Sequence, residues 1–76
     1  MPVSERMAAM GCRLYRNEFF RDVYPEGTSK ERLAMWAASY VLHGMFEVGE
    51  IDNFGTEPTI DDLAQTIIKL NEERGE

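Results

Sequence analysis

The segment Thr28–Val48, TSKERLAMWAASYVLHGMFEV, decides the fold, because apolar residues cover most of its helical wheel. At 100° per residue, one narrow wedge holds Trp36 together with the polar side chains Arg32, Ser39, His43 and Glu47. The other positions are apolar or small, a wider arc than two neighbouring helices usually cover. We therefore expect a central, mostly buried helix and an additional partner that covers the rest of its surface.

The first expected helix has a clear core face and two apolar residues outside it. Ser4 is a favourable N-cap, and Pro25 lies beyond the expected end at residue 23. Phe20 and Met10 project among arginines, where we expect them to be exposed unless another chain covers them. The core side chains recur at helical spacing: Ala8, Cys12, Tyr15, Phe19 and Val23.

Capping signals place two further helices. Thr28 and Glu31 have the spacing of a capping box, and Gly49 can end the helix that they begin. Thr59 and Asp62 form a second such pair. The sequence predicts a compact three-helix, all-α domain over residues 1–76, with helices over residues 5–23, 29–48 and 60–73.

The composition is typical of one small globular domain. The chain has 76 residues, of which 43% are hydrophobic and 29% charged. Cys12 is the only cysteine, which excludes a disulfide within the chain and a cysteine zinc site. No apolar run is long enough to span a bilayer, and the first residues lack an export signal. We therefore expect a cytoplasmic protein with no membrane partner.

Negative charge is concentrated in the last thirty residues of a chain whose net charge is −6. Through Phe46, six basic residues balance five acidic ones, whereas nine acidic residues face only two basic ones from Glu47 onward. An acidic surface repels phosphate backbones and attracts basic protein surfaces. We expect no direct binding of nucleic acid. Two interpretations of the acidic residues stay open, a solubilising surface and a docking surface for a basic partner.

Ser39, His43 and Glu47 are the residue types of a hydrolase triad, but their spacing argues against catalysis. Side chains at successive i+4 steps of a straight helix point outward in parallel, and no glycine-rich turn supplies an oxyanion hole. His43 and Glu47 could also hold a divalent cation together with Glu50 and Asp52, although a lone histidine and a loop make a weak metal site. We expect no catalytic, cofactor or metal site, and an enzyme that uses His43 and Glu47 is a distant alternative.

Surface features indicate a small acidic protein-binding module. Arg32 and Trp36 are four residues apart, so the guanidinium can stack on the indole and form an interface patch. One form of such a module is an inhibitor, of the kind that viruses and mobile elements use against host defence, which occupies a basic, nucleic-acid-binding surface of its partner. The expected partner-binding residues are Arg32, Trp36, His43, Phe20, Met10, Glu47, Glu50, Asp52 and Glu57.

A homo-oligomer is the main alternative function. The excess apolar surface of the second helix would then pack on its own twofold mate. A stripe of small residues would allow the close approach of the two helices: Ala34, Ala37, Ala38 and Gly44.

Overall fold

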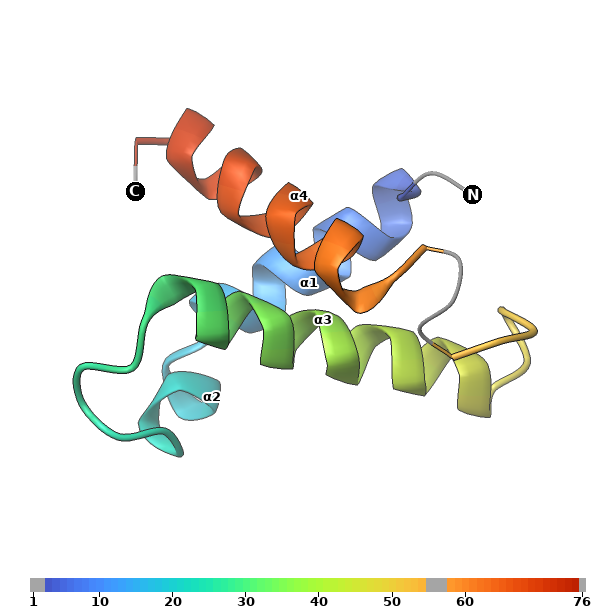
Figure 1. The fold of residues 1–76 in the computed structure, drawn as a ribbon, viewed down its shortest axis with the longest axis horizontal. Helices are drawn as coiled ribbons and strands as arrows, with labels where there is room; N and C mark the ends of the chain where they lie inside the picture. Colours follow the sequence, from blue (N-terminus) through green and yellow to red (C-terminus); the bar gives the residue numbers. More distant parts are fainter. Residues whose placement is uncertain (1–2, 55–57, 76) are drawn as a thin grey trace.

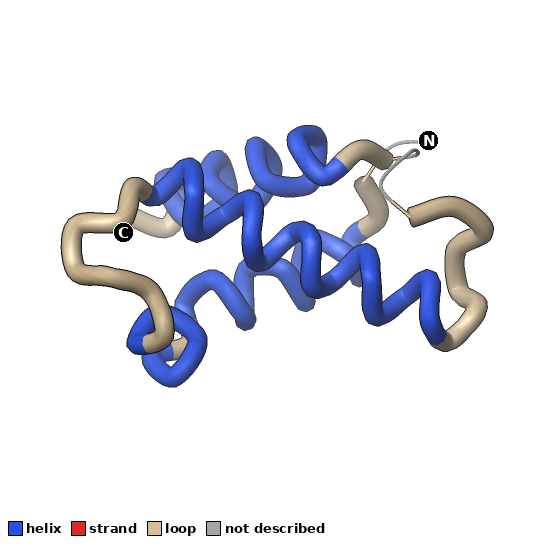
Figure 2. The backbone as a smooth tube through the Cα atoms, turned by 60° about the horizontal axis from the view of Figure 1, so that its bottom comes forward, coloured by secondary structure: helices blue, strands red, loops and turns tan. Residues whose placement is uncertain are grey.

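The computed structural model describes residues 3–54 and 58–75, which form four helices and no strand (Figure 1). The predicted all-α class is confirmed. α3 runs through the middle of the molecule, α1 and α4 pack on one side of it and on each other, and α2 lies below its N-terminal half in Figure 1. The connections 23–29 and 48–54 lie at opposite ends (Figure 2). The helices are α1 (Glu5–Arg16), α2 (Glu18–Asp22), α3 (Lys30–Glu47) and α4 (Ile60–Glu73).

Local capping residues fix three of the predicted helix ends. The hydroxyl of Ser4 accepts a hydrogen bond from the backbone N–H of Met7 at 3.1 Å, as expected for an N-cap. Thr59 and Asp62 form the predicted capping box, with bonds of 3.0 and 3.2 Å between side chain and backbone in both directions. Gly49 follows the end of α3 with a φ of 79°, a conformation that favours glycine. These three predictions are confirmed.

The predicted helix over residues 5–23 is wrong, because Asn17 divides it into α1 and α2. Asn17 has an extended backbone, and its side-chain oxygen accepts a hydrogen bond from the N–H of Phe20 at 3.0 Å. An asparagine side chain competes with the helical hydrogen bonds of the backbone in this way. The break changes the direction of the following turn, so Phe19 and Val23 are 82% and 73% exposed instead of buried.

Arg21 stabilises the break between α1 and α2. Its Nε donates a hydrogen bond to the carbonyl oxygen of Tyr15 at 2.6 Å, an oxygen that a continuous helix would have paired with the N–H of Phe19. The guanidinium also lies over the Tyr15 ring, with its carbon 4.5 Å from the ring centroid. The arginine therefore replaces the hydrogen bond that the break removes.

The predicted capping box of Thr28 and Glu31 is also wrong. The N-cap of α3 is Ser29, whose hydroxyl accepts a hydrogen bond from the N–H of Arg32 at 3.2 Å. The Thr28 hydroxyl instead donates to the carbonyl oxygen of Pro25 at 2.6 Å and closes the preceding turn. Thr28 and Ser29 are both possible N-caps, and Ser29 takes this role because the Thr28 hydroxyl bonds to Pro25.

The core lies where α3 meets α1 and α4. Leu42, Leu63 and Ile67 are among its fully buried large side chains. Gly11 lets α1 approach α4 closely, since a Cβ at this position would lie 2.6 Å from the Cδ1 of Ile67. The small residues of α3 that were expected to form a dimer interface are fully buried within the chain, so that part of the homodimer prediction is wrong: Ala34, Ala37 and Ala38.

Candidate functional site

The side of α3 that α1 and α4 leave uncovered carries large apolar side chains. Met35, Trp36, Tyr40 and Phe46 are 45%, 47%, 58% and 42% exposed. Met35, Tyr40 and Phe46 belong to the apolar arc that was expected to be too wide for two neighbouring helices, and α1 and α4 do leave this part of it uncovered. We name this surface the outer face; in chain order, its residues are Arg32, Met35, Trp36, Ser39, Tyr40, His43, Phe46 and Glu47.

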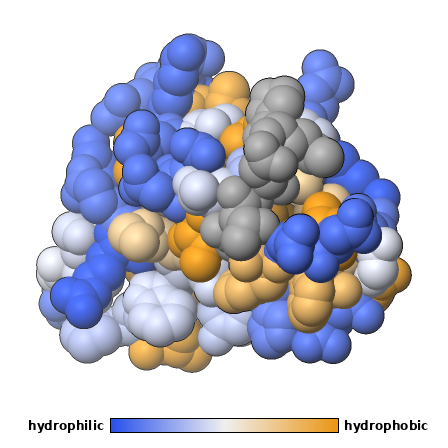
Figure 3. All heavy atoms as spheres, turned by 45° about the vertical axis from the view of Figure 1, so that its right-hand side comes forward, coloured by the Kyte–Doolittle hydropathy of each residue, from blue (hydrophilic) through white to orange (hydrophobic). Residues whose placement is uncertain are grey.

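Apolar residues continue beyond the C-terminal end of the outer face. Val48 is 71% exposed, and Phe54 is 38% exposed in the following loop. Figure 3 views the molecule from this end and shows hydrophobic residues that reach the surface between hydrophilic ones. Several large apolar residues exposed on one side of a molecule are typical of an interaction surface, whereas single exposed apolar residues are not.

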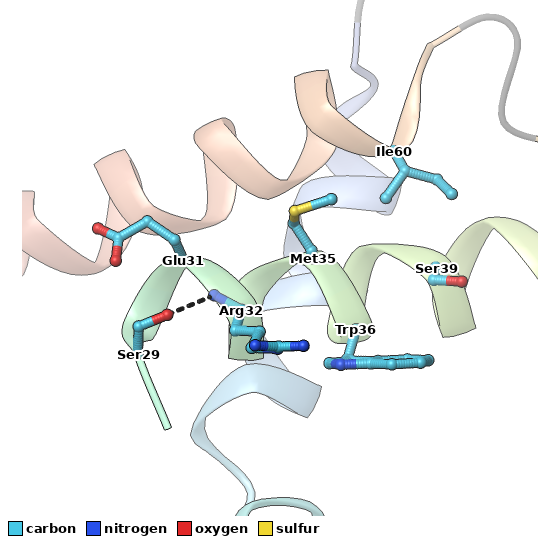
Figure 4. Close-up of a pocket in the computed structure, with 7 residues that line it drawn as sticks. All are labelled: Ser29, Glu31, Arg32, Met35, Trp36, Ser39 and Ile60. Atoms are coloured by element: carbon cyan, nitrogen blue, oxygen red, sulfur yellow. Dashed lines mark hydrogen bonds between the residues drawn. The ribbon is translucent and has the colours of Figure 1, made fainter. Parts of the chain in front are cut away.

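An open groove of about 520 Å³ lies along the N-terminal half of the outer face. Met35 of α3 and Ile60 of α4 lie on one side of it, and Arg32 and Trp36 extend on the other (Figure 4). Ser39 lines the groove toward the middle of α3. The groove therefore combines apolar walls with the guanidinium of Arg32, the carboxylate of Glu31 and hydroxyl groups, the mixture that binding sites commonly present.

Aromatic stacking holds Trp36 in place. Its ring stacks on Tyr24 with a centroid distance of 6.1 Å and an interplanar angle of 29°. Phe20 follows with edge contacts to Tyr24 at 5.2 Å and to Tyr40 at 6.0 Å. The expected exposure of Phe20 among the arginines is therefore wrong, because the break before α2 turns this side chain toward α3, where it is half-buried.

The predicted stacking of Arg32 on Trp36 is not formed. Figure 4 shows the Arg32 guanidinium beside the indole rather than above its face. Within the described residues, the cation–π contact is that of Arg21 over Tyr15. Tyr24 occupies the face of the indole instead. Sequence spacing alone could not reveal this, because Tyr24 lies outside the helix and reaches Trp36 only through the fold of the α2 turn.

Met10 lies next to the outer face. It is 37% exposed, as expected, and lines a groove of about 340 Å³ between α1 and α3. Tyr40 lines the same groove and joins it to the outer face. The apolar surface thus extends from α3 onto α1.

His43 and Glu47 form the C-terminal end of the outer face. The His43 Nε2 lies 2.9 Å from the Oε1 of Glu47, and the His43 ring lies 5.3 Å from that of Phe54. Both side chains are exposed. The spacing i, i+4 brings them together as the sequence predicted.

The other expected acidic residues do not gather on the outer face. Glu50 pairs with Arg6 of α1, and Asp52 is exposed in the loop after α3. Asp62 caps α4, and Asp61 accepts a hydrogen bond from Gln65 at 2.9 Å. Glu57 lies outside the described residues. Several of the acidic residues that suggested a docking surface therefore serve local contacts.

Cys12 lines a separate groove of about 610 Å³ between α1 and α4. Burial raises the pKa of its thiol above the ordinary value of 9.0, while the nearby guanidinium groups of Arg16 and Arg74 act in the opposite direction. A thiol with a raised pKa is a poor nucleophile at neutral pH.

In the described ranges, no group of three or more His, Cys, Asp or Glu side chains could hold a metal ion. None of the helices there is long and apolar enough to cross a membrane. Comparisons with known proteins found no match to a family model, a curated protein or a solved structure.

Proposed function

We propose that this chain is a non-enzymatic protein-binding module that docks its partner through the outer face. The observation that carries the proposal is the exposure, between 42% and 58%, of four large apolar side chains on one side of α3: Met35, Trp36, Tyr40 and Phe46. Tryptophan, tyrosine and arginine are the residue types that contribute most to interface energetics. The groove of about 520 Å³ beside Trp36 gives an apolar side chain of the partner a place to insert.

The partner that suits this surface presents an apolar strip with basic side chains at one end. Glu47 ends the outer face, and Asp52 is exposed just beyond it, so the C-terminal end of the surface is acidic. A basic surface that normally binds nucleic acid has this chemistry, and occupying it would make the chain an inhibitor.

A pair of alanine variants tests the docking face. A partner would first be captured from an extract of the source cells with the immobilised chain and then purified. Its affinity would be measured by calorimetry for the wild type, for Trp36→Ala and for Phe19→Ala. Phe19 is the matched control, since it is an aromatic residue that is 82% exposed outside the outer face. We expect Trp36→Ala to weaken binding by at least about tenfold and Phe19→Ala by less than about twofold.

Equal affinities of the two variants would contradict docking through the outer face. His43→Ala should weaken binding less than Trp36→Ala, because an imidazole contributes less contact area than an indole. A turnover that disappears in His43→Ala, with binding indifferent to Trp36→Ala, would favour the enzyme instead.

The charge of the partner is tested by association kinetics. If the acidic end guides the chain onto a basic surface, the association rate should fall as salt is raised, because exposed charges are screened beyond about 8–10 Å at physiological ionic strength. Asp52→Lys should lower the rate at low salt without disturbing the fold, since Asp52 is exposed in the loop. A rate that is indifferent to both changes would leave the acidic residues as a solubilising surface.

A further inference from the structure

The outer face carries its charges in the order that a lone helix disfavours. Arg32 lies in the first turn of α3 and Glu47 is its last residue, whereas the positive end of a helix dipole is the N-terminus and the negative end is the C-terminus. Each of these side chains is therefore repelled by the helix end beside it. Within α3 the last turn contains no basic residue that would offset the dipole.

Within the described chain, neither charge is paired with an arginine, lysine, aspartate or glutamate of opposite sign. Within residues 3–54 and 58–75, no ion pair or side-chain hydrogen bond reaches the guanidinium of Arg32. Glu47 contacts His43 on its own helix, and within the same ranges no arginine or lysine pairs with it. An arginine and a glutamate thus remain exposed at opposite ends of one apolar surface.

We propose that a second copy of this chain occupies the outer face, with the two α3 helices antiparallel about a twofold axis that passes between Ser39 and Tyr40. This proposal rests on the proposed function, because it names an occupant of the same docking face. The antiparallel order sets Arg32 of one copy beside Glu47 of the other, and this contact occurs twice. Each charge then also lies at the helix end of opposite sign.

The same register brings the aromatic groups of the outer face together. Arg32 and Glu47 each lie 7.5 residues from the axis, or about 11 Å at 1.5 Å per residue. Trp36 and His43 each lie 3.5 residues from it, so the indole of one copy meets the imidazole of the other about 5 Å from the centre. A parallel arrangement would instead place Arg32 beside Arg32 and Glu47 beside Glu47.

Apolar contact supplies the affinity in this arrangement, and the charges select the orientation. Each copy has a net charge of −6, so the two copies repel each other at low salt, and this repulsion is screened at physiological ionic strength. Exposed ion pairs contribute little energy, but like charges placed face to face exclude a register. Self-association also covers the outer face, so it competes with any other protein that docks there.

Charge reversal tests the register, because mixing two reversed variants should restore the dimer, whereas mixing would not repair a general loss of stability. Arg32→Glu and Glu47→Arg each place like charges together twice in a dimer of identical copies. An equal mixture of the two variants restores both opposite-charge contacts. Lys69→Glu is the matched control for Arg32→Glu, because it makes the same change of charge on the exposed surface of α4, away from the outer face. The masses would be measured by sedimentation equilibrium in about 0.15 M salt, with circular dichroism as the check of folding.

We expect the wild type and Lys69→Glu to form dimers. Each outer-face variant alone should have a dimer dissociation constant raised at least about tenfold, and their mixture should form a dimer. Either of two results would overturn the proposal: a wild type that stays monomeric to about 100 µM, or outer-face variants that dimerise as the wild type does. A monomeric wild type whose partner binding is still lost in Trp36→Ala would overturn the second copy and leave the proposed function standing. Failure of the proposed function itself would appear as partner binding that Trp36→Ala does not change.

Discussion

The close contact between α1 and α4 predicts an unfavourable effect for a substitution that normally stabilises a helix. Gly11 lies within α1, so Gly11→Ala should gain about 1 kcal/mol from helix propensity. Its new Cβ would lie 2.6 Å from the Cδ1 and 2.9 Å from the Cγ1 of Ile67, whereas carbon atoms prefer a separation of about 3.5–4.0 Å. Ile67 is fully buried and has little room to move, and overpacking of this kind costs about 1–3 kcal/mol. We expect a net loss of about 1 kcal/mol.

A double-mutant cycle identifies the cause. Ile67→Val removes the Cδ1 methyl group and should cost about 1 kcal/mol on its own. In the double variant the alanine methyl uses part of the vacated space, so the combined loss should be smaller than the sum by about 1 kcal/mol. Urea unfolding measures all four proteins, with equal slopes required for the comparison. Gly44→Ala is the control, because a Cβ there meets no atom within 4 Å and should stabilise by about 1 kcal/mol. Additive losses, or a Gly11→Ala protein as stable as Gly44→Ala, would refute the packing argument.

Three further predictions concern local structure. In urea titrations, Ser29→Ala should lower the free energy of unfolding by about 1 kcal/mol, and Thr28→Ala should lower it clearly less. A larger loss for Thr28→Ala than for Ser29→Ala would make Thr28 the N-cap. Phe20→Ala should lower the free energy of unfolding by about 2–3 kcal/mol, because the Phe20 ring lies between two tyrosines. Phe19→Ala should change it by no more than about 0.5 kcal/mol, and equal losses measured by calorimetry would contradict the orientation of α2. The raised pKa keeps the Cys12 thiol neutral in the folded state, so its alkylation at pH 8 should be slower in the folded protein than in the urea-unfolded protein, and equal rates would contradict this. For the same reason, the free energy of unfolding should fall as pH rises past 9.0.

Three helix ends that depend on neighbouring residues alone could be predicted from the sequence. Ser4, the Thr59–Asp62 pair and Gly49 act within one turn of their own positions, and the structure confirms all of them. Asn17 is different, since its side chain can either stay on a continuous helix or cap a new one. The choice depends on Arg21, which satisfies the carbonyl group that the break leaves without a partner. That contact joins two helices and has no signature in a helical wheel.

The candidate site was predicted in part for a similar reason. The width of the apolar arc on α3 indicated that some of it would stay uncovered, and the exposed Met35, Tyr40 and Phe46 agree with this. The sequence did not show which residues of the arc would stay uncovered, because that depends on how far α1 and α4 reach around α3. The position of Phe20 was missed, because a single register carried through Asn17 sends its side chain to the wrong side.

Site-specific photocrosslinking tests the central claim, that the outer face is a docking surface, most directly. Benzoylphenylalanine would replace Trp36 in one protein and Phe19 in another, and both would be irradiated in the source cells. Both positions carry exposed aromatic residues, but only the first belongs to the outer face. We predict that position 36 forms a crosslink to a defined protein, either a partner or a second copy, that excess unlabelled chain suppresses, while position 19 does not. Equal yields at the two positions, or no crosslink from position 36, would contradict the claim.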